Sequence, residues 1–226
     1  MFGKVLFGVV AVAVIIIALL ALGKAQDNAG KPAVSELSEI TAEDHATGKL
    51  DSLVTLVEYS DFQCPACAQY APLVEEVISN YSDKVRFVYR HYPIYSKHPN
   101  AENGGRAAEA AAKQGKFFEY GSVLFTNQTE WSVMDNPEDK LAEYAKSLGL
   151  NEEQFRKDYK DSASKDRVTK DYQSGLKAGV TGTPTFFLNG KAIGNNPQSY
   201  AAFAKLLDAE LAKTTTPATD TIPVSP

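Results

Sequence analysis

The 226-residue chain has only two cysteines, Cys64 and Cys67, which are separated by Pro65 and Ala66. A disulfide between them would close a very short loop, so it would remove little conformational entropy from the unfolded chain. No other cysteine is present to pair with either one. The Cys-x-x-Cys spacing therefore predicts a redox-active dithiol, whose two thiols react with each other or with a partner outside the chain.

The residues around this pair predict a strand, a helix and a second strand. Residues 54–59 form a nearly continuous apolar run, which is typical of a strand buried on both faces. Pro65 suits the first position of a helix, where its missing N–H costs nothing, and Pro72 should kink that helix. A second β-rich run follows at 85–90, so the intervening helix allows a parallel pair with a right-handed crossover.

The following residues predict a helical block, a β-hairpin and a last helix. Helical patterns extend over residues 100–178. Asn189-Gly190 then lies between β-rich runs at 184–188 and 191–193, which is a strong hairpin signal. An amphipathic helix is expected over 197–212. The predicted order is β-α-β, a helical block and β-β-α, within a single α/β domain.

An apolar run from Val5 to Leu22 precedes this domain and contains no charged side chain. About 18 apolar residues just span a hydrocarbon core of roughly 30 Å in helical conformation. We therefore expect residues 1–23 to form a single transmembrane anchor, with the domain on the extracytoplasmic side of the cell membrane. The alternative is a cleaved signal peptide, because Ala21-Leu22-Gly23 fits a cleavage site, and the mature protein would then be secreted or periplasmic.

Polar segments flank the predicted domain, which spans 45–212. Residues 24–44 are rich in small and polar residues, as expected of a tether. Residues 213–226 are rich in Thr and Pro and should form a disordered tail. The net charge of −5 and the lack of a basic cluster argue against a nucleic-acid partner.

Several motifs occur along the chain in the order seen in one known family. Cys64-Pro65-Ala66-Cys67 stands at the predicted strand-to-helix junction, and Pro72 follows within the helix. Residues 180–185 (VTGTPT) precede the hairpin, and Asp44-His45 and Gly48 precede the first predicted strand. This ordered set resembles the DsbA-type thiol-disulfide oxidoreductases, specifically their membrane-anchored or secreted branch.

The resemblance covers about 45–210 and implies a thioredoxin fold, with β-α-β and β-β-α halves around a mixed sheet. A helical domain would be inserted between the halves, at about 100–178. The resemblance also implies that Cys64 is the solvent-facing nucleophile and Cys67 the more buried, resolving thiol. Helix physics agrees, because orphan N–H groups and the helix dipole favour a thiolate at the N-terminus. A stabilised thiolate makes the corresponding disulfide a better oxidant.

The resemblance also bears on Thr183, Pro184 and the residues between the cysteines. Family members keep a cis proline that faces the active-site sulfurs, which implies this state for Pro184. The backbone of Thr183 would then be free to pair with an extended substrate chain. The Thr183 side chain sits where family members tune redox behaviour, although a plain turn residue is the alternative in so turn-prone a stretch. Pro65-Ala66 lacks the histidine of the strongest oxidants, so we expect a less extreme reduction potential.

Glu58 lies six residues before Cys64 in an otherwise apolar strand. Strand alternation places its side chain on the same face as Val54 and Leu56. A buried carboxyl beneath the disulfide would have a raised pKa and could relay a proton from Cys67. Family members carry an acid at the matching position. The alternative is a solvated glutamate at a strand end.

A zinc site is the main competing interpretation of the cysteine pair. The only histidines available as further ligands are His45, His91 and His98, and their spacing does not fit the usual pattern of structural zinc sites. We expect these histidines to lie on the surface or in loops, and we expect neither a metal nor a separate cofactor. The redox-active Cys64–Cys67 disulfide would be the only redox group.

These observations predict an enzyme that forms disulfides in exported, cysteine-containing proteins. By family analogy a quinone-linked membrane partner would reoxidise it, and the chain would act as a monomer. A reductase or isomerase of the same fold is one alternative, although no dimerisation domain supports an isomerase. A non-catalytic thioredoxin-like binding or chaperone module is another.

Overall fold

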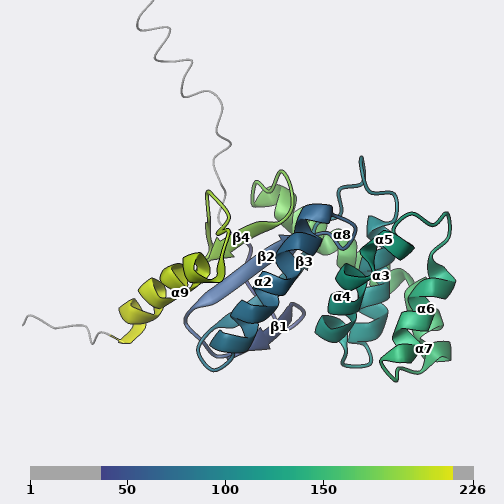
Figure 1. The fold of residues 1–226 in the computed structure, drawn as a ribbon, viewed down its shortest axis with the longest axis horizontal. Coiled ribbons are helices and arrows are strands. Elements are labelled where there is room, and N and C mark those ends of the chain that lie inside the picture. The colour runs from purple at the N-terminus through teal and green to yellow at the C-terminus, as the bar shows by residue number, and fades with distance from the viewer. Residues whose placement is uncertain (1–36, 216–226) are drawn as a thin grey trace, which may run out of the picture. The chain divides into compact units, whose positions relative to one another are not determined.

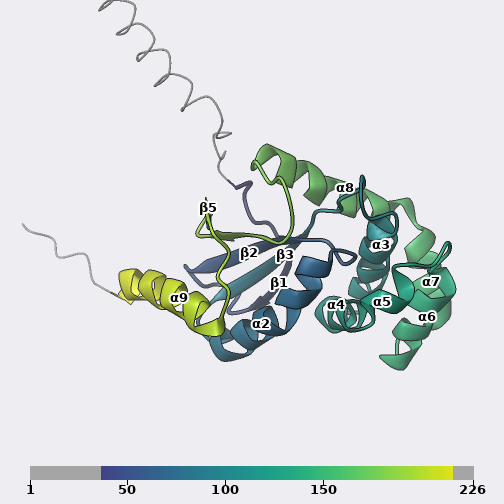
Figure 2. The ribbon, with the colours of Figure 1, turned by 45° about the horizontal axis from the view of Figure 1, so that its top comes forward.

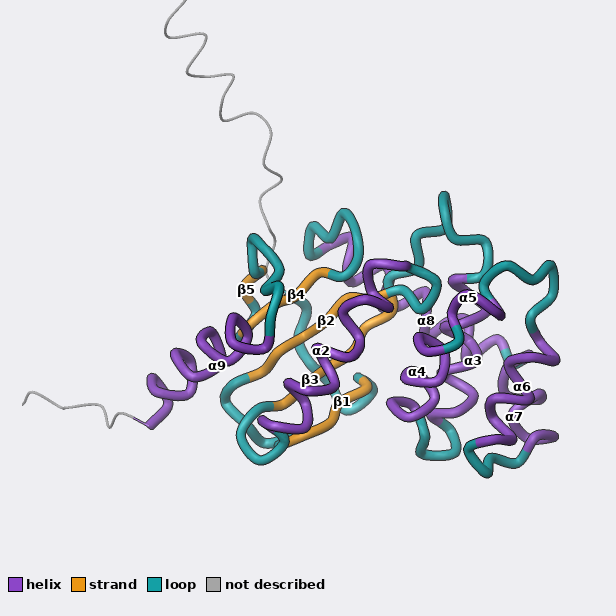
Figure 3. Tube along the Cα trace, in the orientation of Figure 1, coloured by secondary structure: helices purple, strands orange, loops and turns teal. Residues whose placement is uncertain are grey.

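A five-stranded mixed sheet forms the centre of the computed structural model, which describes residues 37–215 (Figures 1 and 3). Its strands are β1 (His45–Gly48), β2 (Thr55–Ser60), β3 (Arg86–His91), β4 (Thr185–Leu188) and β5 (Lys191–Ala192). Their spatial order is β1-β3-β2-β4-β5. β2 and β3 are parallel, and the other three pairings are antiparallel.

The central strand β2 is buried along its whole length, because both faces of the sheet are covered. Leu56 and its neighbours on the same face pack into the larger apolar cluster, to which helices α2 (Pro65–Tyr81) and α9 (Tyr200–Thr215) contribute. Val57 and Tyr59 face the other way, into a smaller cluster with Phe187. Alternation along the strand thus separates the two faces.

Six helices lie between β3 and β4 and form the inserted helical domain (Figures 1 and 2). They are α3 (Ala101–Ala112), α4 (Phe117–Thr126), α5 (Gln128–Trp131), α6 (Glu138–Ser147), α7 (Glu152–Lys160) and α8 (Ser162–Lys177). The predicted order of β-α-β, helices and β-β-α is confirmed, and so is the mixed sheet. α2 continues across Pro72 to Tyr81.

The strand β1 and the segment before it depart from the sequence prediction. β1 was not predicted, and it forms an edge of the sheet by pairing antiparallel with β3. Residues 37–44, expected to be part of a tether, pack onto the domain. Leu37 and Ile40 contact the smaller apolar cluster, and the Asp44 carboxylate pairs with the buried Arg90 guanidinium at 2.7 Å. A buried guanidinium is costly without such a partner, which explains why this segment is held.

The ends of the chain are only partly covered by the structure. The anchor expected at 1–23 lies outside the described residues, as does most of the predicted tail. Helix α9 ends at Thr215 rather than at residue 212. Within residues 37–215, no helix combines the length and the hydropathy that a membrane crossing requires.

Two glycines with the same backbone conformation allow a test of the β1 turn. Gly48 has φ +78°, and a Cβ there would lie 2.4 Å from the Val85 carbonyl oxygen. Gly190 has φ +79°, but a Cβ there would meet nothing within 4 Å. We expect Gly48→Ala to lower the free energy of unfolding by about 3 kcal/mol, from left-handed strain plus overpacking. Gly190→Ala should cost only about 1 kcal/mol. Urea denaturation measures both, and equal losses would contradict the backbone clash.

Candidate active site

Cys64 and Cys67 lie at the start of α2, directly after the loop that leaves the central strand. Cys64 occupies the N-cap position and Pro65 follows at the first helical position. No side chain caps this helix end with a hydrogen bond. The N–H groups of its first turn can therefore interact with the Cys64 sulfur. Both cysteines are reduced, and Cys64 exposes 8% of its surface against 1% for Cys67. Cys64 is therefore the more accessible thiol, as predicted, although it is largely covered.

The two thiols have opposite acidities. A hydrogen bond from the Cys67 side chain lowers the pKa of Cys64 to about 5, against the effect of burial, and the Thr183 side chain and the N–H groups of Cys67 and Ala66 contribute. Burial raises the pKa of Cys67, and the neighbouring Cys64 and Glu58 raise it further. At neutral pH the pair is thus a thiolate beside a protonated thiol, which suits nucleophilic attack by the outer sulfur.

Thr183 and Pro184 face Cys64 from the loop before β4. The peptide bond between them is cis, as the resemblance implied. The Cys64 thiol donates to the Thr183 carbonyl oxygen at 3.5 Å. The Thr183 hydroxyl is buried and has no partner beside the neutral thiol, so it is available to a Cys64 thiolate. On the far side, the Asn196 amide donates to the Pro184 carbonyl oxygen at 2.7 Å, a contact that the sequence analysis missed.

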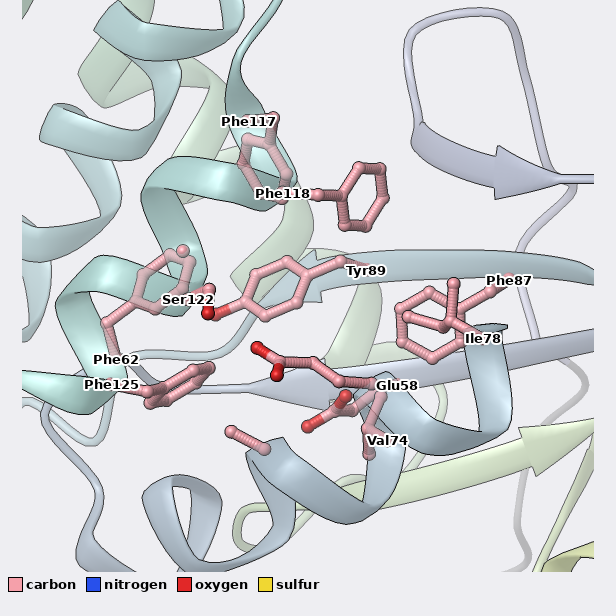
Figure 4. Close-up of a pocket in the computed structure, with 13 residues that line it drawn as sticks. Glu58, Phe62, Val74, Ile78, Phe87, Tyr89, Phe117, Phe118, Ser122 and Phe125 are labelled. Carbon is pink, nitrogen blue, oxygen red and sulfur yellow. The ribbon is translucent and has the colours of Figure 1, made fainter. Parts of the chain in front are cut away.

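Glu58 is buried in the face of the sheet that carries the active site, with 4% of its surface exposed. The alternative of a solvated glutamate is therefore wrong. Burial raises its pKa to about 7, although Ser60 opposes the shift. Figure 4 shows the Glu58 carboxyl pointing into a pocket beside the Tyr89 hydroxyl. The remaining lining is mostly aromatic and aliphatic, from α2, the loop before it, β3 and α4, namely Phe62, Ala71, Val74, Glu75, Ile78, Phe87, Phe117, Phe118, Gly121, Ser122 and Phe125.

Two hydroxyl groups near Glu58 have no hydrogen-bond partner within the described part of the chain. They are Ser60 Oγ and Tyr89 OH, and both are buried. Burying a polar group without a partner costs about 1–3 kcal/mol. Both hydroxyls lie close to the Glu58 carboxyl, whose pKa is raised.

The inserted helical domain holds the active-site loop through an amide clamp. The Gln128 side chain, on α5, donates to the carbonyl oxygens of Phe62 at 2.8 Å and Cys64 at 3.0 Å. The Gln63 amide donates to the Ser132 carbonyl at 2.8 Å and accepts from the Asn100 N–H at 2.6 Å. The two partners of each bond lie more than 30 residues apart in sequence, so no local sequence pattern predicts these contacts.

The prediction of surface or loop positions is wrong for His91, which is only 2% exposed at the end of β3, and for His45, which lies in β1. It is confirmed for His98, which lies in the loop after β3 and pairs with the buried Asp61 at 2.6 Å. His45 and His91 both bond to Glu109, and although burial raises the pKa of Glu109, these two bonds lower it to about 2. Among residues 37–215, neither cysteine belongs to a cluster of three potential metal ligands, which disfavours zinc at the cysteine pair.

The sequence of this chain matches one known protein family. The family model described as "Thioredoxin" matches residues 41–209. The chain belongs to the thioredoxin family.

Solved structures with the same fold include proteins named DsbA, the type that the resemblance indicated. BdbD from Bacillus subtilis superimposes with a TM-score of 0.70 at 24% identity, covering 80% of this chain and 100% of its own. The alpha-DsbA1 of Wolbachia pipientis gives 0.68 at 19% identity, with 78% and 95% covered. The catalytic domain of Proteus mirabilis ScsC gives 0.63 at 20% identity, with 78% and 93% covered. The chain shares its fold with these proteins.

Curated relatives with higher identity are much longer than this chain. A protein named Na(+)/H(+) antiporter NhaA 1, from Mycobacterium sp. strain KMS, is 39% identical over 170 residues, which is 74% of this chain and 26% of that protein. NhaA 3 of Salinispora tropica is 40% identical over 148 residues, 66% of this chain and 22% of that one. The chain thus spans about a quarter of the length of these relatives.

Replacing the Thr183 hydroxyl tests its contribution to the thiolate. We expect a pKa of about 5 for Cys64 in the reduced chain, measured from the ultraviolet absorbance of the thiolate. Thr183→Val should raise this pKa by roughly one unit, because the thiolate loses a hydrogen-bond donor. Thr183→Ser should restore it.

Thr185→Val is the matched control, since the Thr185 hydroxyl donates to the Gly182 carbonyl at 2.7 Å instead. An unchanged pKa in Thr183→Val, or an equal shift in Thr185→Val, would contradict a direct role of the Thr183 hydroxyl.

Proposed function

We propose that the chain is a thiol-disulfide oxidoreductase that forms disulfides in exported proteins through Cys64 and Cys67. One observation carries the proposal: Cys64, the more accessible thiol, stands at the N-terminus of α2 beside the Thr183 carbonyl, while Cys67 is buried. This arrangement lowers the pKa of Cys64 to about 5 and raises that of Cys67. The fold, shared with DsbA-type proteins, supports the same reaction class.

The exchange proceeds in two displacements. The oxidised chain presents the Cys64–Cys67 disulfide, and a substrate thiolate attacks the Cys64 sulfur. The S–S bond breaks, Cys67 leaves and takes up a proton, and a mixed disulfide joins Cys64 to the substrate. A second substrate thiolate then attacks the substrate sulfur of this bond and expels Cys64 as a thiolate. Two electrons pass from substrate to chain, and the substrate gains its disulfide.

The low pKa of Cys64 favours this direction for two reasons. A stable thiolate is a good leaving group in the second displacement. It also stabilises the reduced pair relative to the disulfide, which makes the disulfide a stronger oxidant. A reductase would need the opposite balance, with a reduction potential near that of thioredoxin, about −270 mV.

Glu58 is placed to exchange a proton with Cys67. The carboxyl raises the pKa of Cys67 through its charge, so the two groups are electrostatically coupled. A group with a pKa of about 7 can give a proton to Cys67 when the disulfide opens and take it back on reoxidation. The pocket beside Glu58 offers this proton a route to solvent.

The loop at Thr183 and Pro184 forms the docking edge for the substrate chain. The Cys64 sulfur lies 3.5 Å from the Thr183 carbonyl oxygen, so this carbonyl stands beside the reacting sulfur. An extended substrate segment pairing with this backbone would bring its own cysteine to Cys64, as in β-augmentation.

The cellular setting is part of the same proposal. The apolar run at 5–22 supports a single-pass anchor in the cell membrane with the domain outside the cytoplasm, or export if the run is cleaved. The match to part of proteins named as sodium/proton antiporters also favours a location beside a membrane. We do not extend ion transport to this chain, since the match covers about a quarter of those proteins. A quinone-linked membrane protein would reoxidise the chain, which would act as a monomer with the Cys64–Cys67 pair as its only redox group.

Cysteine variants test the reaction and its direction. We expect the oxidised chain to introduce disulfides into a reduced, unfolded model protein and Cys64→Ser to fall to the uncatalysed rate. Cys67→Ser, offered a model protein that already carries a disulfide, should attack it through the Cys64 thiolate and, lacking the second thiol, accumulate the mixed disulfide. Thiol trapping and gel electrophoresis measure all three.

Equilibration with glutathione gives the reduction potential of the pair. A value clearly above about −270 mV is expected, and a value at thioredoxin's level would favour a reductase. Client binding and client disulfide formation that both survive in Cys64→Ser would indicate a non-catalytic binding module.

Glu58→Gln tests proton transfer at the buried carboxyl. We expect the rate of substrate oxidation to fall about a hundredfold below pH 7, where wild-type Glu58 still holds its proton. The wild-type rate should decline as pH rises through 7, and this decline should vanish in the variant. Glu75→Gln, an exposed carboxyl on the rim of the same pocket, is the matched control and should behave as wild type.

The same variant should change the pH dependence of stability. The pKa of Glu58 is raised in the folded state, from 4.5 to about 7, so the folded chain binds more protons between these values. Its stability should therefore fall as pH rises through this window, by about 3 kcal/mol in all. Denaturation of the oxidised chain, in which the thiols do not titrate, should show this slope in wild type and not in Glu58→Gln. If Glu58→Gln keeps the same pH dependence of stability, a group other than Glu58 is responsible for it.

A further inference from the structure

Two histidines from separate strands meet one glutamate from the inserted helical domain. In the antiparallel pairing of β1 with β3, His45 stands opposite Tyr89. His91 lies two residues beyond Tyr89, so His45 and His91 are diagonal neighbours on one face of the sheet. Glu109 reaches this face from α3. The cluster therefore joins three elements that are far apart in sequence.

The nitrogen atoms of the two imidazoles converge on a single carboxylate oxygen. His45 Nε2 lies 2.6 Å from Glu109 Oε1, and His91 Nε2 lies 2.8 Å from the same atom. The ligand atoms of all three residues lie within 4.8 Å of one another. The side chains of His45, His91 and Glu109 are 14%, 3% and 9% exposed, so the cluster is shielded and is reached past His45.

The rings are held in place by packing before any ligand arrives. His45 stacks on Phe117, with centroids 3.6 Å apart and planes 9° from parallel, and His91 meets the same ring edge-on at 5.7 Å. Behind His91 lies Gly105, where a Cβ would come within 3.3 Å of His91 Nδ1 and 2.9 Å of Val168. The absence of that side chain lets α3 approach the imidazole closely. The donor atoms are thus pre-positioned, which is what a metal site requires.

We propose that His45, His91 and Glu109 bind a divalent first-row transition metal ion of the zinc type. Two imidazole nitrogens with one carboxylate form a donor set that suits zinc and its neighbours, whereas calcium and magnesium prefer oxygen alone. With metal–ligand distances of about 2.0–2.2 Å, tetrahedral geometry separates the donors by roughly 3.4 Å. The two distances from the imidazole nitrogens to Glu109 Oε1, 2.6 and 2.8 Å, need to lengthen by less than 1 Å to reach this spacing.

Metal binding changes the proton positions in a defined way. Each Nε2 now faces the carboxylate as a hydrogen-bond donor, and it would present its lone pair to the metal. The proton moves to Nδ1 in a neutral imidazole, or leaves to solvent from an imidazolium. Three protein ligands leave one position for water.

The site would fasten the inserted helical domain to the sheet. Two ligands come from the sheet and the third comes from α3, so the ion would bridge them. Since an ion bound only by the folded state stabilises that state, the melting temperature should rise with metal concentration. The cysteine pair is a separate group of thiols and takes no part.

Metal titration of the full-length, oxidised chain tests this site. The disulfide form is used because free thiolates would compete for the ion. We expect one equivalent of Zn²⁺ by calorimetry, and a Co²⁺ spectrum typical of nitrogen and oxygen donors without a thiolate charge-transfer band. Glu109→Gln and His45→Gln should each weaken Zn²⁺ binding at least tenfold. His98→Gln, the histidine outside the cluster, should bind as wild type.

Ring resonances provide a readout that does not depend on the variants folding. Zn²⁺ should shift the imidazole signals of His45 and His91 in the wild-type chain and leave His98 unchanged. Failure of the oxidised wild type to bind near-stoichiometric Zn²⁺, or a shift of His98 alone, would overturn the proposal and leave the cluster as a hydrogen-bonded triad. Because thiol exchange is not measured, failure of the proposed oxidoreductase function would not change either outcome.

Discussion

The active site depends on the burial of Cys67 beneath the first turn of α2. Burial keeps this thiol protonated, so it donates a hydrogen bond to the Cys64 sulfur and, more than any other contact, lowers the pKa of Cys64 to about 5. β2 is buried on both faces and leads directly into this turn, so the core fixes where the turn begins. The asymmetry between the two sulfurs therefore comes from the fold as much as from the residues between them.

The inserted helical domain is a working part of this arrangement. Its Gln128 side chain donates hydrogen bonds to the carbonyl oxygens of Phe62 and Cys64, the residues just before α2. Trp131, fully buried beside Gln128 on the same short helix, anchors the clamp, and its indole N–H donates to the Leu124 carbonyl at 2.9 Å. Loss of the insertion would remove the Gln128 donor from the Phe62 carbonyl and leave the Cys64 carbonyl with the Ala68 N–H, so the geometry of the active-site loop depends on the insertion.

The sequence predicted those features that have a local physical cause. Pro65 marked the helix start and Asn189-Gly190 the hairpin, because each has a conformation or a missing donor that suits one position. β1 was missed because its four residues, His45 to Gly48, include a single aliphatic side chain and become a strand only by pairing with β3. The Gln128 clamp and the cluster at Glu109 were missed for the same reason, since their partners are brought together only by the tertiary fold.

Glu58 and Glu109 are both buried carboxyls, but their different neighbours shift their pKa values in opposite directions. The side chains that line the pocket at Glu58 include no lysine, arginine or histidine within the described chain, so burial dominates and its pKa rises to about 7. Glu109 instead receives two imidazoles on one oxygen. A carboxyl without a basic neighbour gains and loses a proton near neutral pH, whereas one held by two nitrogen donors stays charged and is fitted to hold a cation. The first therefore suits proton transfer to a sulfur, and the second suits a structural ion.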